Sequence, residues 1–151
     1  LIVKATPIVK KFKGRGLTPV DYYATNADGR HVTESRAING IIVDIGPKTV
    51  ELYMNIIKEN PESVIIGNGP LGQYEVEENR KGTQEVYSEV FRGENGNFVI
   101  GGGGDFNAVM SILQLKPHIS STGGKAFLEC IVNGYMPGLE PCGIVEVLSD
   151  R

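Results

Sequence analysis

The sequence Gly101-Gly102-Gly103-Gly104-Asp105 separates a short apolar run, residues 97–100, from a segment in which Val109, Ile112 and Leu113 recur at helical spacing. This order predicts a strand, a turn and a helix. Glycine tolerates positive φ angles and lets a large anion approach the backbone N–H groups, which the start of a helix makes electropositive. The run is therefore a candidate phosphate-binding turn, although its glycines also suit a tight connection that binds nothing.

The aspartate that closes the run has two interpretations. A carboxylate is poorly suited to touch phosphate directly, but it can hold a magnesium ion that contacts phosphate in its place. Alternatively, Asp105 or the nearby Asn107 caps the first turn of the helix with a side-chain oxygen. The local sequence leaves the choice open.

Strand and helix patterns alternate along the rest of the chain. Continuous apolar runs at 41–44 and 63–66 suit parallel strands that are covered on both faces. A strand running into a loop is expected at 17–24, and a short strand at 117–121. Apolar residues at helical spacing predict helices between residues 48 and 60, over 83–92, and over 126–132. Because parallel strands need crossover connections, this alternation predicts a three-layer α/β/α fold with a mainly parallel, Rossmann-like sheet.

Glycine-rich loops follow the predicted strands. In open α/β sheets ligands bind at the carboxyl ends of the strands. The loops at 44–48, 67–75, 101–105 and 121–125 are therefore expected to converge on one site.

Composition narrows the classes of protein and of partner. A chain of 151 residues with 40% hydrophobic content suits one compact unit. A net charge of -3 and the lack of a run of 18 apolar residues give no reason to expect a nucleic-acid or membrane partner. Cys130 and Cys142 show neither metal-ligand spacing nor disulfide density, so a cytoplasmic location is expected. The chain opens at Leu1 inside what reads as an element, and we expect a piece of a longer protein.

Other motifs give rival hypotheses. Gly67, Gly69 and Gly72 match the dinucleotide-binding spacing G-x-G-x-x-G, which favours an oxidoreductase domain. That motif needs a helix beginning within its glycines, whereas a polar stretch follows here. A catalytic triad of Ser120, His118 and Asp105 lacks a nucleophile elbow.

A family resemblance rests on motifs in a fixed order. They are Asp44-Ile45-Gly46-Pro47-Lys48-Thr49, Asn68-Gly69-Pro70-Leu71-Gly72 with Glu75, Gly102-Gly103-Gly104-Asp105, and His118-Ile119-Ser120-Ser121-Thr122-Gly123-Gly124 with Leu128-Glu129. Together they resemble the C-terminal nucleotide-binding domain of phosphoglycerate kinase. By this resemblance, residues 1–151 are part of that domain, and the N-terminal substrate domain is absent.

The resemblance implies reversible phosphoryl transfer between 1,3-bisphosphoglycerate and Mg-ADP in glycolysis, giving 3-phosphoglycerate and ATP. The residues that the resemblance assigns to the site would contact different parts of the ligand. Asn68 and Pro70 would line the nucleotide site, Glu75 would hold the ribose hydroxyls, and Gly103, Gly104 and Asp105 would meet the phosphates, Asp105 through Mg²⁺. Gly123 and Gly124 would supply backbone N–H groups to the transferring phosphoryl group. A nonenzymatic nucleotide-binding module is a further alternative.

Several positions depart from the family pattern. Phe106 replaces a serine or threonine after the aspartate, so a hydroxyl contact to phosphate is missing, and Asn107 is a possible substitute. Lys125 replaces a third glycine and is expected to point to solvent. Ile42 is expected to narrow the adenine slot. The segments carrying the remaining lysines and the catalytic arginine are not among these residues, so the isolated chain is expected to lack activity and to expose an apolar sheet edge.

Overall fold

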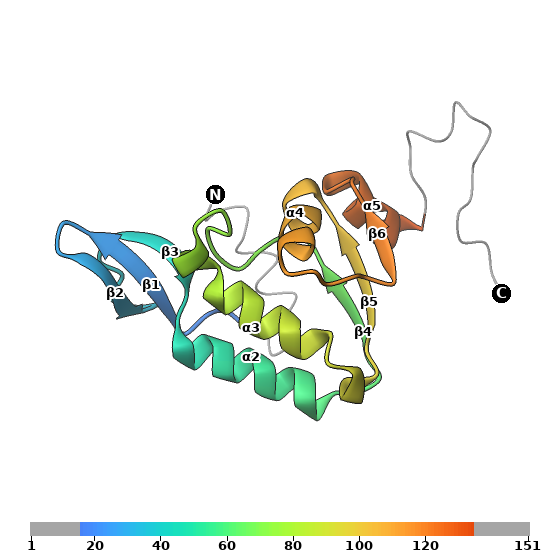
Figure 1. The fold of residues 1–151 in the computed structure, drawn as a ribbon, viewed down its shortest axis with the longest axis horizontal. Coiled ribbons are helices and arrows are strands. Elements are labelled where there is room, and N and C mark those ends of the chain that lie inside the picture. The colour runs from blue at the N-terminus through green and yellow to red at the C-terminus, as the bar shows by residue number, and fades with distance from the viewer. Residues whose placement is uncertain (1–15, 135–151) are drawn as a thin grey trace.

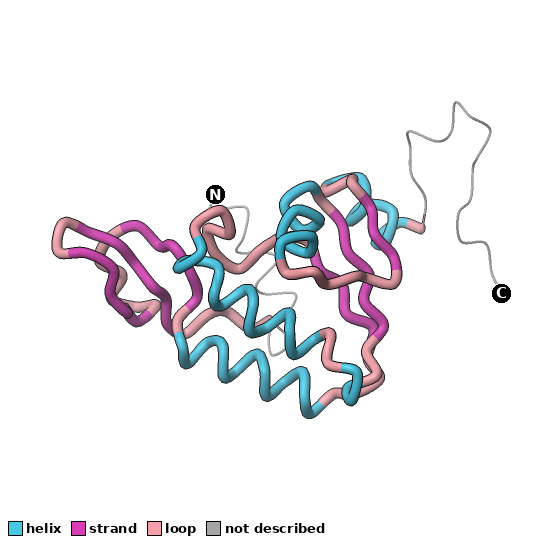
Figure 2. The backbone as a smooth tube through the Cα atoms, in the orientation of Figure 1, coloured by secondary structure: helices cyan, strands magenta, loops and turns pink. Residues whose placement is uncertain are grey.

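The structure is a computed structural model that describes residues 16–134 (Figures 1 and 2). In chain order its elements are β1 (Asp21–Asn26), β2 (Gly29–Glu34), β3 (Ile41–Ile45), α2 (Pro47–Glu59), β4 (Val64–Gly67), the 3₁₀ turn η1 (Glu77–Arg80), α3 (Lys81–Val90), the 3₁₀ turn η2 (Gly93–Asn95), β5 (Phe98–Gly102), α4 (Gly104–Ile112), β6 (Ile119–Ser121) and α5 (Lys125–Asn133). They form two three-stranded sheets, in the orders β2-β1-β3 and β4-β5-β6.

The second sheet is parallel throughout and has helices on both faces. Ile66 pairs with Ile100 and Ile100 with Ile119, so the strands end side by side. Gly101 lies against the ring of Phe106 from α4, and Gly102 lies against the ring of Phe127 from α5. Because neighbouring strand residues point to opposite faces, α4 and α5 cover opposite sides of the sheet. The predicted α/β/α layering around a parallel sheet is confirmed.

The first sheet corrects one prediction. Residues 41–44 were expected to form a parallel strand covered on both faces, but β3 runs antiparallel to β1. Ile41 is 71% exposed and Ile42 40% exposed, so an apolar run here does not mean burial on both faces. The expected loop after β1 is a tight turn into β2, which completes a hairpin. No strand was predicted at β2, because its sequence is mostly polar and gives no hydrophobicity pattern.

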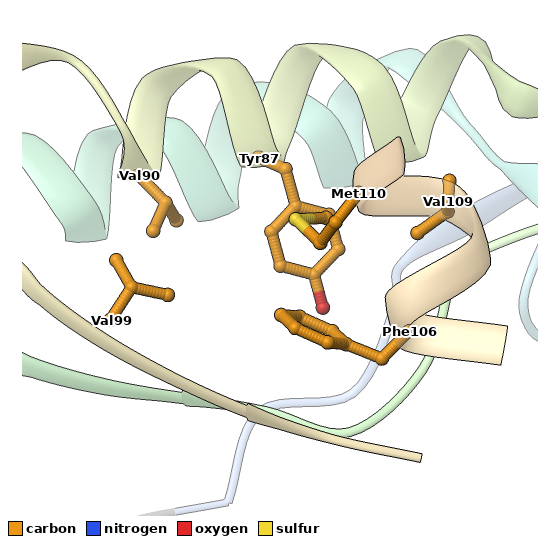
Figure 3. Packing of buried hydrophobic residues seen from close by; sticks show 6 residues of the cluster. All are labelled: Tyr87, Val90, Val99, Phe106, Val109 and Met110. Carbon is orange, nitrogen blue, oxygen red and sulfur yellow. The ribbon is translucent and has the colours of Figure 1, made fainter. Parts of the chain in front are cut away.

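The core lies between the parallel sheet and the helices α3 and α4 (Figure 3). Phe106 is fully buried, and its ring meets that of Tyr87 edge-on, with 5.6 Å between the ring centroids. Val90 and Val99 close the cluster on the other side of Tyr87. Burial of such a ring contributes roughly 2 to 3 kcal/mol. Helix α2 lies along α3 (Figure 1), and the apolar residues of both helices pack into the core.

One side of the parallel sheet is exposed at the end away from α5. The run 63–66 was expected to be buried, but Val64 is 62% and Ile66 48% exposed. Phe98 and Ile119 share this face and are also exposed. The strand β4 is an edge of its sheet, in agreement with the expected apolar edge. Within the described residues, no helix is both long and apolar enough to cross a membrane.

Candidate functional site

The loops after β5 and β6 meet at the carboxyl edge of the parallel sheet. The backbone N–H of Gly103 donates a hydrogen bond of 3.1 Å to the carbonyl of Ser121. A Cβ placed on Gly103 would lie 3.8 Å from Cα of Gly124 and 3.4 Å from Oδ1 of Asn68. The loops after all three parallel strands therefore come together, and the glycines leave bare backbone between them.

The glycines of the run 101–104 have different structural roles. At Gly101 a Cβ would overlap the ring of Phe106, and at Gly102 it would overlap the ring of Phe127, so these two serve packing. Gly103 has φ 100°, which disfavours any residue with a side chain. Gly104 has open space around it and begins α4. Only Gly103 and Gly104 are thus available to a ligand.

Two helix starts face this bare backbone. Helix α4 begins after Gly103 and α5 after Gly124, and neither helix has a side-chain cap from its N-cap residue. Unpaired N–H groups and the helix dipole make such ends attractive to anions. Asp105 lies in the first turn of α4 and is exposed.

Tyr74 connects the loop after β4 to this helix start. Its hydroxyl donates a hydrogen bond of 3.3 Å to Oδ1 of Asp105. Partial desolvation, followed by the Asp105 and Glu75 carboxylates, raises the pKa of Tyr74, so the hydroxyl keeps its proton at neutral pH. Sequence reasoning missed Tyr74; its place directly before Glu75 was the available signal.

The loop that carries Asn68, Pro70 and Glu75 is held on several sides. The Tyr87 hydroxyl donates to the carbonyl of Gly69 at 2.8 Å, and burial raises the pKa of Tyr87 to about 12. Further bonds fix the rest of the loop: Leu71 N–H to Thr83 Oγ1 at 2.9 Å, Gln73 N–H to the Val43 carbonyl at 2.8 Å, and the Arg80 guanidinium to the Tyr74 carbonyl at 2.9 Å. Asn68 and Glu75 are exposed, and Pro70 is half-buried. The loop is therefore preorganised.

The loop at 44–48 does not join this site as predicted. It precedes α2 and belongs to the antiparallel sheet. The buried carboxylate of Asp21 accepts hydrogen bonds from the N–H groups of Lys48 and Thr49, at 3.1 and 2.8 Å. These are the N–H groups that an external anion would need, so the start of α2 is closed.

Helix α3 is closed in the same way. Asp44, fully buried, accepts a hydrogen bond of 2.9 Å from the N–H of Gly82 in the first turn of α3. Burial raises the pKa of Asp44, and the bonds from Gly82 and Ile45 and the charge of Arg30 partly oppose this. Gly72 packs against Asp44. Both carboxylates thus take structural roles.

The structure does not support the dinucleotide-binding motif or the catalytic triad. After Gly67 the next α-helix begins only at Lys81, so the G-x-G-x-x-G match has no helix start within its glycines. His118 accepts a hydrogen bond from the N–H of Val99, and Ser120 donates to Asn107. The triad of Ser120, His118 and Asp105 is therefore wrong.

Two of the positions that depart from the family pattern, Phe106 and Lys125, have structural explanations. Phe106 is a core residue clamped between Gly67 and Gly101 of neighbouring strands. Lys125 points to solvent, as expected, and pairs with Glu129 at 3.4 Å. Neither residue therefore favours a nonenzymatic nucleotide-binding module over an enzyme.

The possible metal ligands near the loops suit a metal ion that is bound mainly by the phosphates of a nucleotide. In the part of the chain that the structure describes, no group of three or more His, Cys, Asp or Glu side chains gathers as a metal site. Asp105 offers one exposed carboxylate. Mg²⁺ in nucleotide sites uses one or two carboxylates, with phosphates and water as its other ligands. The residues fit Mg²⁺ in that form.

Comparison with known proteins agrees with these features. The family model described as phosphoglycerate kinase matches residues 1–133. A phosphoglycerate kinase of Thermococcus sibiricus is 35% identical over 154 residues, covering 93% of this chain and 35% of that protein. One from Buchnera aphidicola is 39% identical over 104 residues, covering 68% of this chain and 26% of that protein.

Solved structures agree in fold. The phosphoglycerate kinase of Pyrococcus horikoshii has a TM-score of 0.75 at 28% identity, covering 95% of this chain and 36% of that chain. That of Coxiella burnetii has a TM-score of 0.74 at 28% identity, covering 92% and 38%. The chain spans about a third of the length of these proteins. With its parallel sheet and its glycine loops at one edge, the chain belongs to the phosphoglycerate kinase family.

Proposed function

We propose that these residues form part of the nucleotide site of a phosphoglycerate kinase, residues 1–151 being a portion of its C-terminal domain. The complete enzyme would transfer a phosphoryl group reversibly between 1,3-bisphosphoglycerate and Mg-ADP. The phosphoglycerate would bind to the N-terminal domain, which is not among these residues. One observation carries the proposal: the uncapped starts of α4 and α5 lie side by side, with Gly103 against Gly124.

Each group in the site has a physical role in this proposal. Gly103 and Gly104 would meet the nucleotide phosphates, and Gly123 and Gly124 would meet the transferring phosphoryl group. The N–H groups of Gly103 and Gly123 donate to Ser121, so the N–H groups of Gly104 and Gly124 are the ones open to phosphate. Phosphoryl transfer depends mainly on positioning and charge stabilisation, which such donors supply. Loss of one preorganised donor typically costs about 3 kcal/mol of transition-state stabilisation.

The remaining side chains would select and orient the nucleotide. Glu75 is an exposed carboxylate beside Tyr74, and an acceptor-only group suits ribose hydroxyls. Asn68 reaches Gly103 from the adjacent strand, while Pro70 shapes the same loop. Asp105 would hold Mg²⁺, which supplies positive charge to the phosphates when bound. A glycolytic enzyme of this kind would work in the cytoplasm, which cell fractionation can test.

Ligand-dependent stability tests the proposal. The melting temperature of the chain should rise with Mg-ADP and not with NAD, because a ligand at 100 times its dissociation constant stabilises by about 2.7 kcal/mol. Stabilisation by NAD alone would point to the dinucleotide alternative. Binding of Mg-ADP without phosphoryl transfer is expected of the isolated chain, and turnover by it would contradict the assignment of catalytic groups to the missing residues.

A matched pair of variants tests the metal contact. Asp105→Ala should remove the Mg²⁺ dependence of ADP binding, measured by calorimetry with and without the metal. Asp28→Ala removes another exposed carboxylate, from the β1–β2 turn, and should leave that dependence unchanged. Retained Mg²⁺ dependence in Asp105→Ala would exclude Asp105 as the metal contact.

A further inference from the structure

Asn107 lies where the two glycine loops meet. It is the fourth residue of α4 and is half-buried. Its Nδ2 donates hydrogen bonds to the carbonyl of Gly103 at 3.0 Å and to the carbonyl of Ser121 at 2.8 Å. One amide group therefore bridges the loop after β5 and the loop after β6.

The orientation of this amide is determined by its neighbours. Both carbonyl oxygens can only accept hydrogen bonds, so the NH₂ group must face them. The remaining oxygen, Oδ1, accepts a hydrogen bond from the hydroxyl of Ser120. The donors and the acceptor of the Asn107 side chain are thus engaged by protein groups. Asn107 does not replace the missing hydroxyl as a phosphate contact.

The same Ser121 carbonyl also joins the two loops directly. The Gly103 N–H bonds to the same Ser121 carbonyl that receives the Asn107 amide. In the following loop, the Gly123 N–H donates to the Ser121 hydroxyl at 3.2 Å. Ser121 therefore links the amide of Asn107 to the turn that contains Gly123 and Gly124.

We infer that Asn107 is a positioning residue that fixes the separation between the loop of Gly103–Gly104 and the loop of Gly123–Gly124, so that one polyphosphate can contact both. This inference rests on the proposed function. Asn107, Ser120 and Ser121 then act as one unit, in which the Ser120 hydroxyl supplies a partner to the amide oxygen. Fixed donors bind an anion more tightly than mobile ones, since less ordering is needed on binding.

The experiment uses inorganic pyrophosphate with Mg²⁺ as the probe and the 151-residue chain labelled with ¹⁵N-glycine. Amide resonances of Gly103, Gly104, Gly123 and Gly124 should shift as pyrophosphate is added. Asn107→Ala should require about tenfold more pyrophosphate for half of the shift, because both bridging bonds are lost. Ser120→Ala keeps those bonds and loses only the partner of Oδ1, so about a threefold increase is expected.

Ser111→Ala is the matched control. Its exposed hydroxyl donates a hydrogen bond to the backbone carbonyl of Asn107 within the same helix and makes no hydrogen bond to either loop. It should bind pyrophosphate like the unmodified chain. Alanine favours helices, so the substitutions in α4 should not disrupt the helix. Unchanged resonances of Gly29 and Gly82, which lie away from the site, would show that the variants fold.

The outcomes separate the inference from the proposed function. If the unmodified chain binds pyrophosphate and Asn107→Ala binds it equally well, Asn107 does not position the loops, while the proposed function stands. Equal weakening by Ser111→Ala and Asn107→Ala would also overturn the inference, because it would reveal a general loosening of α4. If the unmodified chain binds neither pyrophosphate nor Mg-ADP, the proposed function itself fails.

Discussion

The four α-helices of the described residues begin in two different ways. In α2 and α3, buried aspartates from the antiparallel sheet accept hydrogen bonds from the first-turn N–H groups: Asp21 serves α2 and Asp44 serves α3. Helix α2 follows a glycine, Gly46, as α4 and α5 do, so the N-cap residue does not make the difference. In α4 and α5 no side chain among the described residues accepts a hydrogen bond from the first-turn N–H groups. The closed starts belong to one half of the molecule and the open starts to the other.

This difference separates structural anions from ligand sites. Every helix start carries unpaired N–H groups and partial positive charge, so it attracts an anion. Where the protein supplies the carboxylate, the requirement is met internally. Where no protein carboxylate accepts these N–H groups, an external phosphate can meet the same requirement. The motif at 44–48 therefore has a structural role, whereas the helix starts at 101–105 and 121–125 are open to an external anion.

Removal of an internal anion should have the largest effect on stability. Asp21→Ala leaves the N–H groups of Lys48 and Thr49 and the Thr49 hydroxyl without their carboxylate partner in a buried place. We expect a loss of about 3 kcal/mol in the free energy of unfolding, measured by urea denaturation. Asp105→Ala, at an open start, should change it by no more than about 0.5 kcal/mol. Similar losses in the two variants would remove the distinction between closed and open starts.

Within the glycine run, substitutions at Gly101 and Gly104 should differ in their effect on stability, by less than the difference expected for the two aspartates. Gly101→Ala places a methyl group into the ring of Phe106 and should cost about 2 kcal/mol, since overpacking a filled core typically costs 1 to 3 kcal/mol. Gly104→Ala meets open space and should leave stability unchanged or slightly higher. Thermal unfolding of the two variants measures this, and equal stabilities would show that Gly101 is not required for packing.

A smaller effect is expected where Tyr74 meets the open start of α4. Tyr74→Phe removes the hydroxyl that holds Asp105 and keeps the ring. Because the bond is long and exposed, we expect Mg-ADP to bind about threefold more weakly, with unchanged stability. Calorimetric titration at fixed Mg²⁺ measures the affinity. Tyr22→Phe, in the antiparallel sheet, is the control, and equal changes in both variants would rule out a specific role for the Tyr74 hydroxyl.

The smallest effect concerns pH at a closed start. Burial raises the pKa of Asp44 above its ordinary value of 3.8, so the folded state binds the Asp44 proton more tightly than the unfolded state. Protonation of Asp44 therefore adds stability below pH 3.8, and this contribution is lost as pH rises through the raised pKa. The stability of the unmodified chain relative to Asp44→Asn should fall over that interval and then become constant. A relative stability that rises with pH there would mean that the pKa is lowered.

Local patterns were sufficient for the helices and for the parallel strands. Helical spacing at Val50, Tyr53 and Ile57 predicted α2, and the apolar runs before Gly67 and Gly101 predicted β4 and β5. The helix patterns succeed because burial of one helix face leaves a periodic record in the sequence. The apolar runs identified the strands but overstated the burial of β4. The motif order also pointed to the family before any contact was known.

Strand partners and side-chain contacts required the tertiary structure. The run 41–44 has the composition of a parallel strand, yet its hydrogen bonds go to β1, because an apolar pattern reports burial and not the identity of the neighbour. The same limit applies to Tyr74 with Asp105, and to Asn107 between Gly103 and Ser121. The contacts of Tyr74 with Asp105 and of Asn107 with Ser121 join residues of different loops and elements, and only the packed sheet and helices bring their atoms within hydrogen-bonding distance.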